Sequence, residues 1–454
     1  MAKRYNIERL TREEIFGGRL IAPMRQWLQL HKGMSDTRNY NYNADMAIIT
    51  HYLQNRNTPE RELYEEDALP LIETYYRATH TDLPENAEVD MAAAERLFDA
   101  ASEGELCQKY RHNNTFTFVD LFAGIGGFRI AMEQLGGRCV YSSEFNTTAQ
   151  KSYGMNHGVI PFGDITQQAN KDRIPEHVDV LCAGFPCQPF SMAGKRLGFA
   201  DEAKGTLFYH LQKIIAAKRP RVIFLENVRG LMSIRNKQVE GEQIEEKTID
   251  TILRILRQEL DYYVPDPQII NARNFGVAQN RDRVFIVGFD NRGEGEYEYP
   301  TGEGIPDVHF GDIREPKVGT QYYMSNQYWN TLLRHREAQH AQGRGYGYCT
   351  IGDDDFGHTL MVGGMGLERN LIVDENHEDL SNVNDPRGEL NHDHIRVLTE
   401  RECARMQGFP DEFAIVVGKH PAYDQFGNSV AVPAIREVAR TLLEYAGIEH
   451  KDIE

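Results

Sequence analysis

The chain has 454 residues, of which 41% are hydrophobic and 26% are charged, a composition typical of a soluble globular protein of two or three domains. It has no run of about 18 apolar residues, no apolar leader and no Cys-x-x-Cys pair, which argues against a membrane span, secretion, a disulfide framework and a thiolate zinc site. The net charge of −18 argues against a nucleic-acid partner, but residues 185–235 hold nine Lys or Arg against three Asp or Glu, so a basic face permits DNA binding.

Residues 1–112 have a polar, helical pattern. Apolar side chains at Ile48, Ile49, Tyr52 and Leu53 recur at helical spacing, and no catalytic constellation accompanies them. We therefore predict a helical N-terminal accessory region, since amphipathic stretches usually pack. A DNA-contacting or regulatory module is the alternative interpretation.

From about residue 113 the pattern changes to strands that alternate with helices. Strands are predicted at 116–122, 137–143, 178–182, 222–225 and 284–287, with helices at 128–135, 207–217 and 248–260. This alternation predicts an α/β domain over 113–292 with a parallel sheet covered by helices. Residues 293–391 look irregular and indicate a smaller domain of binding loops. Helical patterning returns at 399–406 and 432–445, within a C-terminal segment over 392–454.

A glycine-rich turn at 123–127 lies between the first strand and the first helix of this domain. It departs from the dinucleotide fingerprint, because the third glycine of that pattern would fall at Arg129. Glu144 follows the next strand, where a carboxylate can accept both ribose hydroxyls, and Asp164 follows the next break and could accept from an adenine amino group. Each is an ordinary strand-end carboxylate if taken alone. Together they favour a pocket for S-adenosylmethionine over one for NAD.

The tripeptide Pro186-Cys187-Gln188 displays a thiol after a strand. A lone cysteine is more often a small buried residue, but the carboxyl end of a sheet is where open α/β folds do chemistry. Glu226 follows the strand at 222–225, where partial desolvation can keep a carboxyl group protonated near neutral pH.

A run of alternating polar residues precedes the last strand of the domain. Gln279, Arg281 and Arg283 would share one face if the segment is extended. Two arginines on one face suit an anionic or carbonyl-bearing substrate, although surface salt bridges would use them equally well.

Six short motifs between about residues 115 and 445 resemble those of the DNA cytosine-5 methyltransferases, and they follow one another along the chain in the order found in that family. The chain looks like the bacterial enzymes that modify CC-N-GG or CCGG sites. The motifs are the cofactor loop at 122–126, Pro186-Cys187-Gln188, the acidic motif at 226–228, the Gln-x-Arg-x-Arg motif at 279–283, and the closing motifs at 396–402 and 425–430.

The resemblance implies transfer of a methyl group from S-adenosylmethionine to C5 of a cytosine flipped out of double-stranded DNA, with S-adenosylhomocysteine as product. The Cys187 thiolate would add to C6, Glu226 would act at N3, and Arg283 would hold O2 with Arg281 in support.

The resemblance also implies a Rossmann-like methyltransferase sheet with a target-recognition domain at 293–391. The cofactor-binding residues would be Phe122, Gly124, Gly126, Glu144, Asp164, Ile165 and Asn428. The DNA-binding residues would be Gln188, Ser191, Lys195, Arg196, Lys204, Arg344 and Thr359. Lys204 stands where many relatives have Arg, which changes the loop geometry and the phosphate contact expected there. Glu400 stands where many relatives have Pro, with little effect expected on the chemistry.

We expect a monomeric, cytoplasmic protein of a bacterium or phage, with a cognate restriction endonuclease as a further partner. His392-Asp393-His394 fits a solvated loop better than a metal site, so we expect no metal. Three alternatives stay open: a DNA- or RNA-binding protein without catalysis, a thiol hydrolase, which lacks a nearby histidine base, and an RNA-directed relative. Methylation of an amino group is disfavoured, because residues 185–188 lack the Pro-Pro-aromatic motif of those enzymes.

Overall fold

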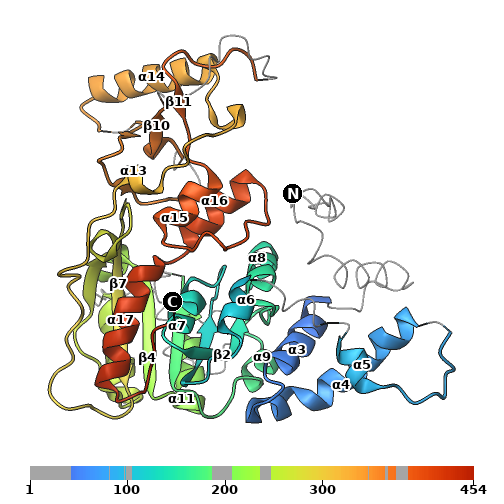
Figure 1. Cartoon of the computed structure of the whole chain (residues 1–454). Coiled ribbons are helices and arrows are strands. Elements are labelled where there is room, and N and C mark those ends of the chain that lie inside the picture. The colour runs from blue at the N-terminus through green and yellow to red at the C-terminus, as the bar shows by residue number, and fades with distance from the viewer. Residues whose placement is uncertain are drawn as a thin grey trace, which may run out of the picture.

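A six-stranded sheet with the strand order β2-β1-β3-β4-β7-β5 lies at the centre of the molecule (Figure 1). The computed structural model describes residues 42–80, 82–96, 98, 105–186, 207–235, 247–345, 347–362, 367–374 and 387–453. The strands of this sheet are β1 Phe116–Leu121, β2 Gly137–Ser143, β3 Val180–Gly184, β4 Val222–Val228, β5 Gln268–Asn271 and β7 Asp282–Phe289.

Strands β1 to β4 run parallel, whereas β7 is antiparallel to both β4 and β5. The α/β fold with a mainly parallel sheet is confirmed, but the predicted parallel direction is wrong at β7. Residues 272–281 alone connect β5 to β7, and so short a connection suits an antiparallel pair rather than a helical crossover. β3 also begins two residues later than predicted, since its pairing with β4 runs from Val180 to Gly184.

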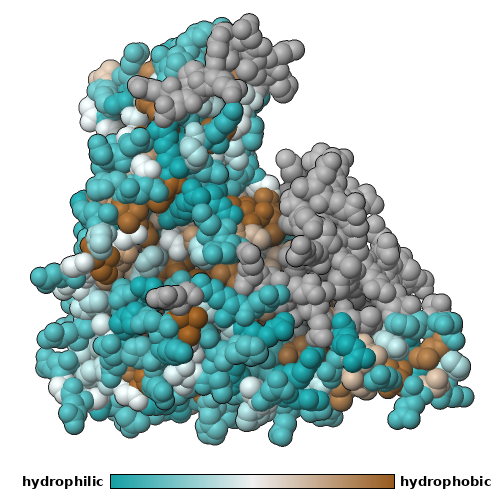
Figure 2. Space-filling view, viewed as in Figure 1, coloured by the Kyte–Doolittle hydropathy of each residue, from teal (hydrophilic) through white to brown (hydrophobic). Residues whose placement is uncertain are grey.

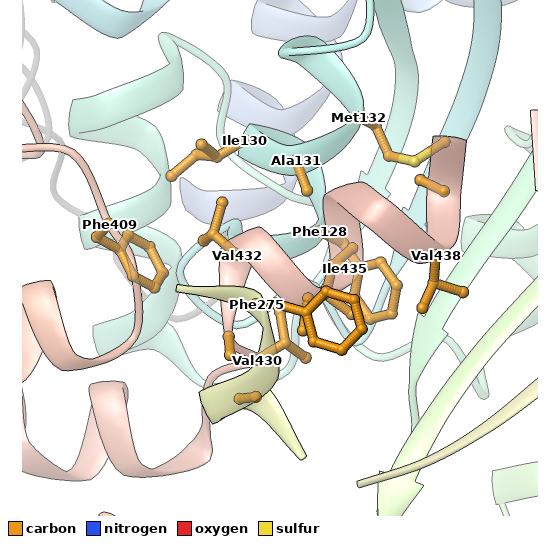
Figure 3. Packing of buried hydrophobic residues seen from close by; sticks show 14 of the residues in the cluster. Phe128, Ile130, Ala131, Met132, Phe275, Phe409, Val430, Val432, Ile435 and Val438 are labelled. Atoms are coloured by element: carbon orange, nitrogen blue, oxygen red, sulfur yellow. The ribbon is translucent and has the colours of Figure 1, made fainter. Parts of the chain in front are cut away.

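The three predicted helical stretches of this part form helices, and the structure adds two helices that were not predicted, at 147–157 and 168–172. The helices are α7 Gly127–Glu133, α8 Thr147–His157, α9 Gln168–Asp172, α11 Leu207–Lys218 and α12 Thr248–Arg254, with a π-helical turn at Ile255–Glu259 and 3-10 turns at Arg229–Met232 and Ala272–Phe275. Side chains of successive strand residues point to opposite faces of the sheet, so two apolar layers form. On one of these faces α7 packs against α17, where Phe128 lies close to Ile435 and Val438 (Figure 3).

The described N-terminal residues are helical, as predicted. They form α3 Tyr42–Gln54, a 3-10 turn Pro59–Arg61, α4 Glu62–Thr79, α5 Met91–Arg96 and α6 Glu105–Tyr110. Helices α3 and α4 lie beside the β2 edge of the sheet, and their buried residues Ile49 and Tyr64 belong to the same cluster as Val140 of β2 (Figure 1). These helices therefore share a hydrophobic core with the sheet.

Residues 293–391 carry a long helix and two strands of a small three-stranded sheet with the order β11-β10-β8, whose strand β11 lies just beyond them in the C-terminal segment. The elements are α13 Phe310–Ile313, the turns Thr320–Tyr322 and Leu367–Arg369, α14 Asn326–Ala341, β8 Thr350–Ile351, β10 Leu371–Val373 and β11 Ile395–Arg396. The prediction of an irregular region is wrong at α14. This helix is mostly polar and buries only Trp329 and Leu332, so its periodicity is weak; the N-cap Ser325, which accepts from the Tyr328 amide at 3.3 Å, was the available signal.

The C-terminal segment forms α15 Glu400–Met406 and α17 Val432–Tyr445, close to the predicted bounds, and α16 Lys419–Asn428, where no helix was predicted. Thr399 and Glu402 form a capping box at the start of α15, which fixes where the helix begins. Helices α15 and α16 lie between the part that carries α14 and the main sheet (Figure 1). Within the described ranges, no helix is both long enough and apolar enough to cross a membrane.

Candidate active site

A cavity of about 1250 Å³ opens at the carboxyl ends of the parallel strands, where the sequence places its motifs. Figure 2 shows apolar residues gathered across the middle of one face of the molecule, below the part that carries α14. The lining residues come from the turns after β1, β2 and β3, from β4, from the start of β7, from residues 359–361 and from the end of α16. They include Phe122, Gly124, Glu144, Phe145, Asp164, Ile165, Pro186, Glu226, Asn227, Arg281, Arg283, Thr359, Leu360, Met361 and Asn428.

The turn after β1 has a backbone that most side chains disfavour. Phe122 has φ 56°, Gly124 has φ 57° and Gly126 has φ 89°, all in the left-handed region. A Cβ atom at Gly126 would lie 2.2 Å from Nε2 of His157, so only glycine fits there. The turn can therefore present backbone amides closely to a ligand.

Glu144, directly after β2, is held by two backbone amides. Its Oε2 accepts from the Gly124 amide at 2.8 Å and its Oε1 accepts from the Asn146 amide at 2.6 Å. Burial raises the pKa of this carboxyl group, and the bonds from the backbone amides oppose that rise. Glu144 is thus fixed at the cavity with lone pairs left for further hydrogen bonds.

The aromatic ring of Phe145 is an additional feature that the sequence reading missed. It lines the cavity and is 77% exposed, which is unusual for so large an apolar side chain. An aromatic residue directly after the strand-end acid was the signal that could have identified it. A planar apolar surface beside Glu144 suits the stacking of a flat ring.

Asp164 and Ile165 belong to another chain segment that lines the same cavity. Oδ1 of Asp164 accepts from the Thr166 amide at 2.9 Å, and Ile165 is buried. Asn428, the last residue of α16, also lines the cavity. All seven residues predicted to bind the cofactor lie on this turn or around this cavity.

Glu226 and Arg283 form the charged centre of the cavity. Nε of Arg283 lies 2.9 Å from Oε1 of Glu226, across the neighbouring strands β4 and β7. Burial raises the pKa of Glu226, and the charges of Arg283 and Arg281 oppose that rise. Burial thus favours the neutral form of this carboxyl group, and the contact with Arg283 fixes its position.

Arg281 is buried and binds backbone carbonyls instead of a carboxylate. Its guanidinium donates to Gly427 O at 3.0 Å, to Leu360 O at 3.4 Å and to Ser429 O. Burial lowers the pKa of Arg281, and the nearby charge of Arg283 lowers it further. Arg281 thus connects the end of α16, through hydrogen bonds, to residues 359–362, which line the cavity.

Gln279 supports the same segment. Its Oε1 accepts from the Leu360 amide at 2.9 Å and its Nε2 donates to Met406 O at 2.9 Å. The Thr359 hydroxyl donates to Asn280 O at 2.6 Å. Thr359 therefore lies at the cavity that holds Glu226 and Arg283, with its side-chain donor engaged by the protein backbone.

Asn227 is a second residue that the sequence reading missed. Its Nδ2 donates to Phe185 O at 2.7 Å, two residues before Cys187. A side chain of β4 thus holds Phe185, which lies close in sequence to the predicted nucleophile. The position directly after Glu226 was the available signal.

Several predicted residues are placed elsewhere or fall outside the described ranges. Arg344 is exposed beyond the end of α14 and does not line the cavity. The residues that lie outside the described part of the chain are Cys187, Gln188, Ser191, Lys195, Arg196 and Lys204. Where the structure describes the chain, no three His, Cys, Asp or Glu side chains gather as for a metal ion, and Nε2 of His392 lies 3.0 Å from Oε1 of Glu389.

Comparison with known proteins gives one consistent result. The model of the C-5 cytosine-specific DNA methylase family matches residues 116–444. The type II methyltransferase M.HpaII of Haemophilus parainfluenzae is 49% identical over 368 residues, which are 80% of this chain and 98% of that protein. M.DsaV of Dactylococcopsis salina is 38% identical over 340 residues, with 74% of this chain and 88% of that protein covered.

Solved structures share the fold at low sequence identity. The Dnmt2 methyltransferase of S. pombe superposes with a TM-score of 0.54 at 19% identity, covering 72% of this chain and 98% of its own. The methyltransferase EhMeth of Entamoeba histolytica gives a TM-score of 0.53 at 16% identity, covering 73% and 98%. The sheet and its surrounding helices therefore form an architecture found in other methyltransferases.

Proposed function

The chain belongs to the C-5 cytosine-specific DNA methylase family, and we propose that it methylates C5 of a cytosine flipped out of a specific double-stranded DNA sequence. The observation that carries this proposal is the buried Glu226–Arg283 pair, with its Nε–Oε1 distance of 2.9 Å, in the same cavity as Glu144 and Asp164. The half of the cavity around Glu226 and Arg283, here called the cytosine half, thus suits a polar base. The half around Glu144 and Asp164, here called the cofactor half, suits a nucleoside.

The cofactor half fits S-adenosylmethionine, which supplies the methyl group when bound. Glu144 would accept from the ribose hydroxyls, Phe145 would stack on the adenine, and Asp164 would accept from the adenine amino group. The left-handed turn at Phe122 and Gly124 leaves room for the backbone to approach the ligand closely. Ile165 and Asn428, which line the cavity, and Gly126, in the turn after β1, would complete this half of the site.

The cytosine half would work by covalent activation of the ring. The Cys187 thiolate forms a bond to C6, and the electron pair of the C5–C6 double bond makes C5 nucleophilic. Glu226 donates a proton or hydrogen bond at N3, and Arg283 donates to O2, so that the developing charge is neutralised. After C5 has accepted the methyl group, it loses its proton and the S–C6 bond breaks, which restores the double bond and the thiolate.

Arg281 would act on this reaction through its neighbours. It holds Gly427 and Ser429 at the cofactor half and Leu360 at the other half, so it sets the spacing between the two. We assign it a positioning role beside the groups that touch the base.

DNA contacts would come from the segment after Cys187 and from the domain that carries α14. The segment is basic and rich in glycine, which suits closure on phosphates, and Gln188 would fill the gap left by the flipped base. Arg344, exposed after α14, can reach a groove and would bind guanine O6 and N7 together. The other proposed contacts are Ser191, Lys195, Arg196, Lys204 and Thr359. The target class is CC-N-GG or CCGG, with a restriction endonuclease of the same specificity as partner.

Methyl transfer to defined DNA tests the function directly. The purified full chain is incubated with labelled S-adenosylmethionine and duplexes that contain CCGG, CC-N-GG or neither, and the modified base is identified after digestion. We expect 5-methylcytosine in one target duplex only. Label on adenine or on cytosine N4 would overturn the assignment, and DNA binding without methylation would favour a protein that has lost catalysis.

A trapping experiment tests the covalent step separately. With 5-fluorocytosine in the target, the C5 substituent cannot leave, so we expect a stable protein–DNA adduct that Cys187→Ala abolishes. Cys349→Ala is the matched control, because Cys349 is half-buried and does not line the cavity. An adduct that survives in Cys187→Ala would assign the nucleophile to another residue.

A further inference from the structure

We propose that His51, in the N-terminal helix α3, is a positioning residue of the cofactor site, because it holds both chain segments that lead to Glu144 and Asp164. The inference rests on the proposed role of these two carboxylates in binding the nucleoside. Helix α3 precedes residues 116–444, which match the family model, so this support comes from the N-terminal region of the chain.

The first contact is to the outer edge of β2, the edge strand of the sheet. Nε2 of His51 lies 3.1 Å from the Ser142 amide nitrogen, and Nδ1 of His51 lies 2.8 Å from Ala47 O. A carbonyl oxygen only accepts, so Nδ1 carries the proton and Nε2 accepts from the Ser142 amide. Both His51 and Ser142 are fully buried, and in the described structure this imidazole is the acceptor of the Ser142 amide.

The second contact is to the segment before Asp164. The His51 ring lies 4.5 Å, centroid to centroid, from the ring of Phe162, which in turn stacks on Tyr141 of β2 at 5.1 Å. The neighbouring Thr50 hydroxyl oxygen accepts from the Ile160 amide at 3.0 Å. Two adjacent side chains of α3 therefore hold residues 160 and 162, just before Asp164.

Backbone hydrogen bonds join these two segments to each other. Ser142 O accepts from the Phe162 amide at 2.9 Å, and Phe162 O accepts from the Glu144 amide at 2.8 Å. These bonds form a short ladder between residues 142–144 and residue 162. His51 binds Ser142 and packs on Phe162, so it contacts both segments of this ladder, one leading to Glu144 and the other to Asp164. A shift at this ladder changes the distance between the two carboxylates.

The cytosine half of the cavity does not depend on this ladder. Glu226 and Arg283 are on β4 and β7, which β1 and β3 separate from β2. Loss of the His51 contacts should therefore weaken cofactor binding and leave the chemistry at the base unchanged once cofactor is saturating. This separation distinguishes a positioning role from a general loss of stability.

The test uses the full-length protein and titration calorimetry with S-adenosylhomocysteine. His51→Phe keeps the ring and removes the acceptor, whereas His51→Gln places an amide oxygen near the position of Nε2. Tyr52→Phe is the matched control on α3, because the Tyr52 hydroxyl donates to Glu95 at 2.8 Å, within the N-terminal region. We expect Kd to rise about tenfold in His51→Phe and to stay within about twofold of wild type in the other two variants, since the strain from an unpaired Ser142 amide would leave about one tenth of the molecules with both carboxylates in place for binding.

Turnover and DNA affinity complete the test. We expect kcat at saturating S-adenosylmethionine and the DNA Kd of His51→Phe to match wild type. An unchanged cofactor Kd in His51→Phe, or an equal loss in Tyr52→Phe, would overturn the inference. If His51→Phe does not fold, Thr50→Val removes the acceptor of the Ile160 amide and carries the same expectation, so an unchanged Kd there also overturns it. A wild-type protein that binds no S-adenosylhomocysteine would instead overturn the proposed function.

Discussion

Arg283 and Glu226 are joined by an ion pair, with Nε of the arginine 2.9 Å from Oε1 of the carboxylate. The pair links neighbouring strands, although the two residues are far apart in sequence. Burial of Glu226 would favour its neutral form, and Arg283 opposes this effect. The balance between the two determines how readily the carboxyl group can donate to a bound base.

Replacing Arg283 by Ala removes the nearest counter-charge of Glu226 and the proposed donor to cytosine O2. We expect kcat to fall by about 10²–10³-fold, as for the loss of one preorganised donor to a developing charge. Methyl transfer from labelled cofactor measures it. Arg229→Ala is the control, because the Arg229 side chain is 68% exposed and pairs with Asp282 at 2.8 Å; we expect activity near wild type there. Full activity in Arg283→Ala would remove this residue from the reaction.

The raised pKa of Glu226 predicts a specific pH dependence. The proposed donor is the protonated carboxyl group, so its advantage over a non-titrating amide declines as pH rises through its pKa. We therefore expect the ratio of kcat/KM between wild type and Glu226→Gln to be largest at low pH and to fall with rising pH. Ionisation of Cys187 affects both proteins equally and cancels in this ratio. A ratio that is constant with pH would show that proton donation by Glu226 does not contribute.

Removing the side-chain amide of Asn227 should misplace the turn that leads to Cys187. The bond from its Nδ2 to Phe185 O, at 2.7 Å, is lost in Asn227→Ala and in Asn227→Asp, which has no donor. We expect kcat to fall by about 10- to 100-fold in both, since small errors in placing a reacting group are costly. Single-turnover methylation and S-adenosylhomocysteine titration measure the effects, and the cofactor Kd should not change. A selective loss of cofactor affinity would contradict this assignment.

The buried His51 predicts how stability depends on acid. Burial lowers the pKa of His51 to about 3, and its surroundings are Tyr64, Tyr141 and the positive charge of Arg129. The pKa of His51 is lower in the folded protein than in the unfolded chain. The contribution of neutral His51 to the free energy of unfolding is therefore complete above about pH 6.5, and it is lost at about 1.4 kcal/mol per pH unit as the pH falls toward 3. Urea unfolding at several pH values should show a shallower acid loss in His51→Gln. Equal slopes would mean that His51 does not contribute.

Local patterns identified most elements of the main sheet. The strand at 137–143 and the helix at 432–445 have the predicted bounds, and the helix carries a clear apolar period. Helix α14 was missed, since only Trp329 and Leu332 are buried and the rest of its surface is polar. The direction of β7 was missed because strand direction depends on connection length and pairing, which the apolar pattern does not encode.

The sequence by itself determined which chemical groups this protein has and in what order, since the motifs around Cys187, Glu226 and Arg283 are short and local. It also indicated that Glu144 follows a strand at one edge of the sheet; the strand expected before Asp164 is only an isolated bridge at Phe162, which pairs with Ser143. Only the tertiary structure decided that Arg283 pairs with Glu226, that Arg281 binds carbonyls of α16, and that His51 supports the edge of β2. The physical reason is that apolar periodicity reports how a segment folds, whereas the partner of a buried polar group depends on which distant segments pack together.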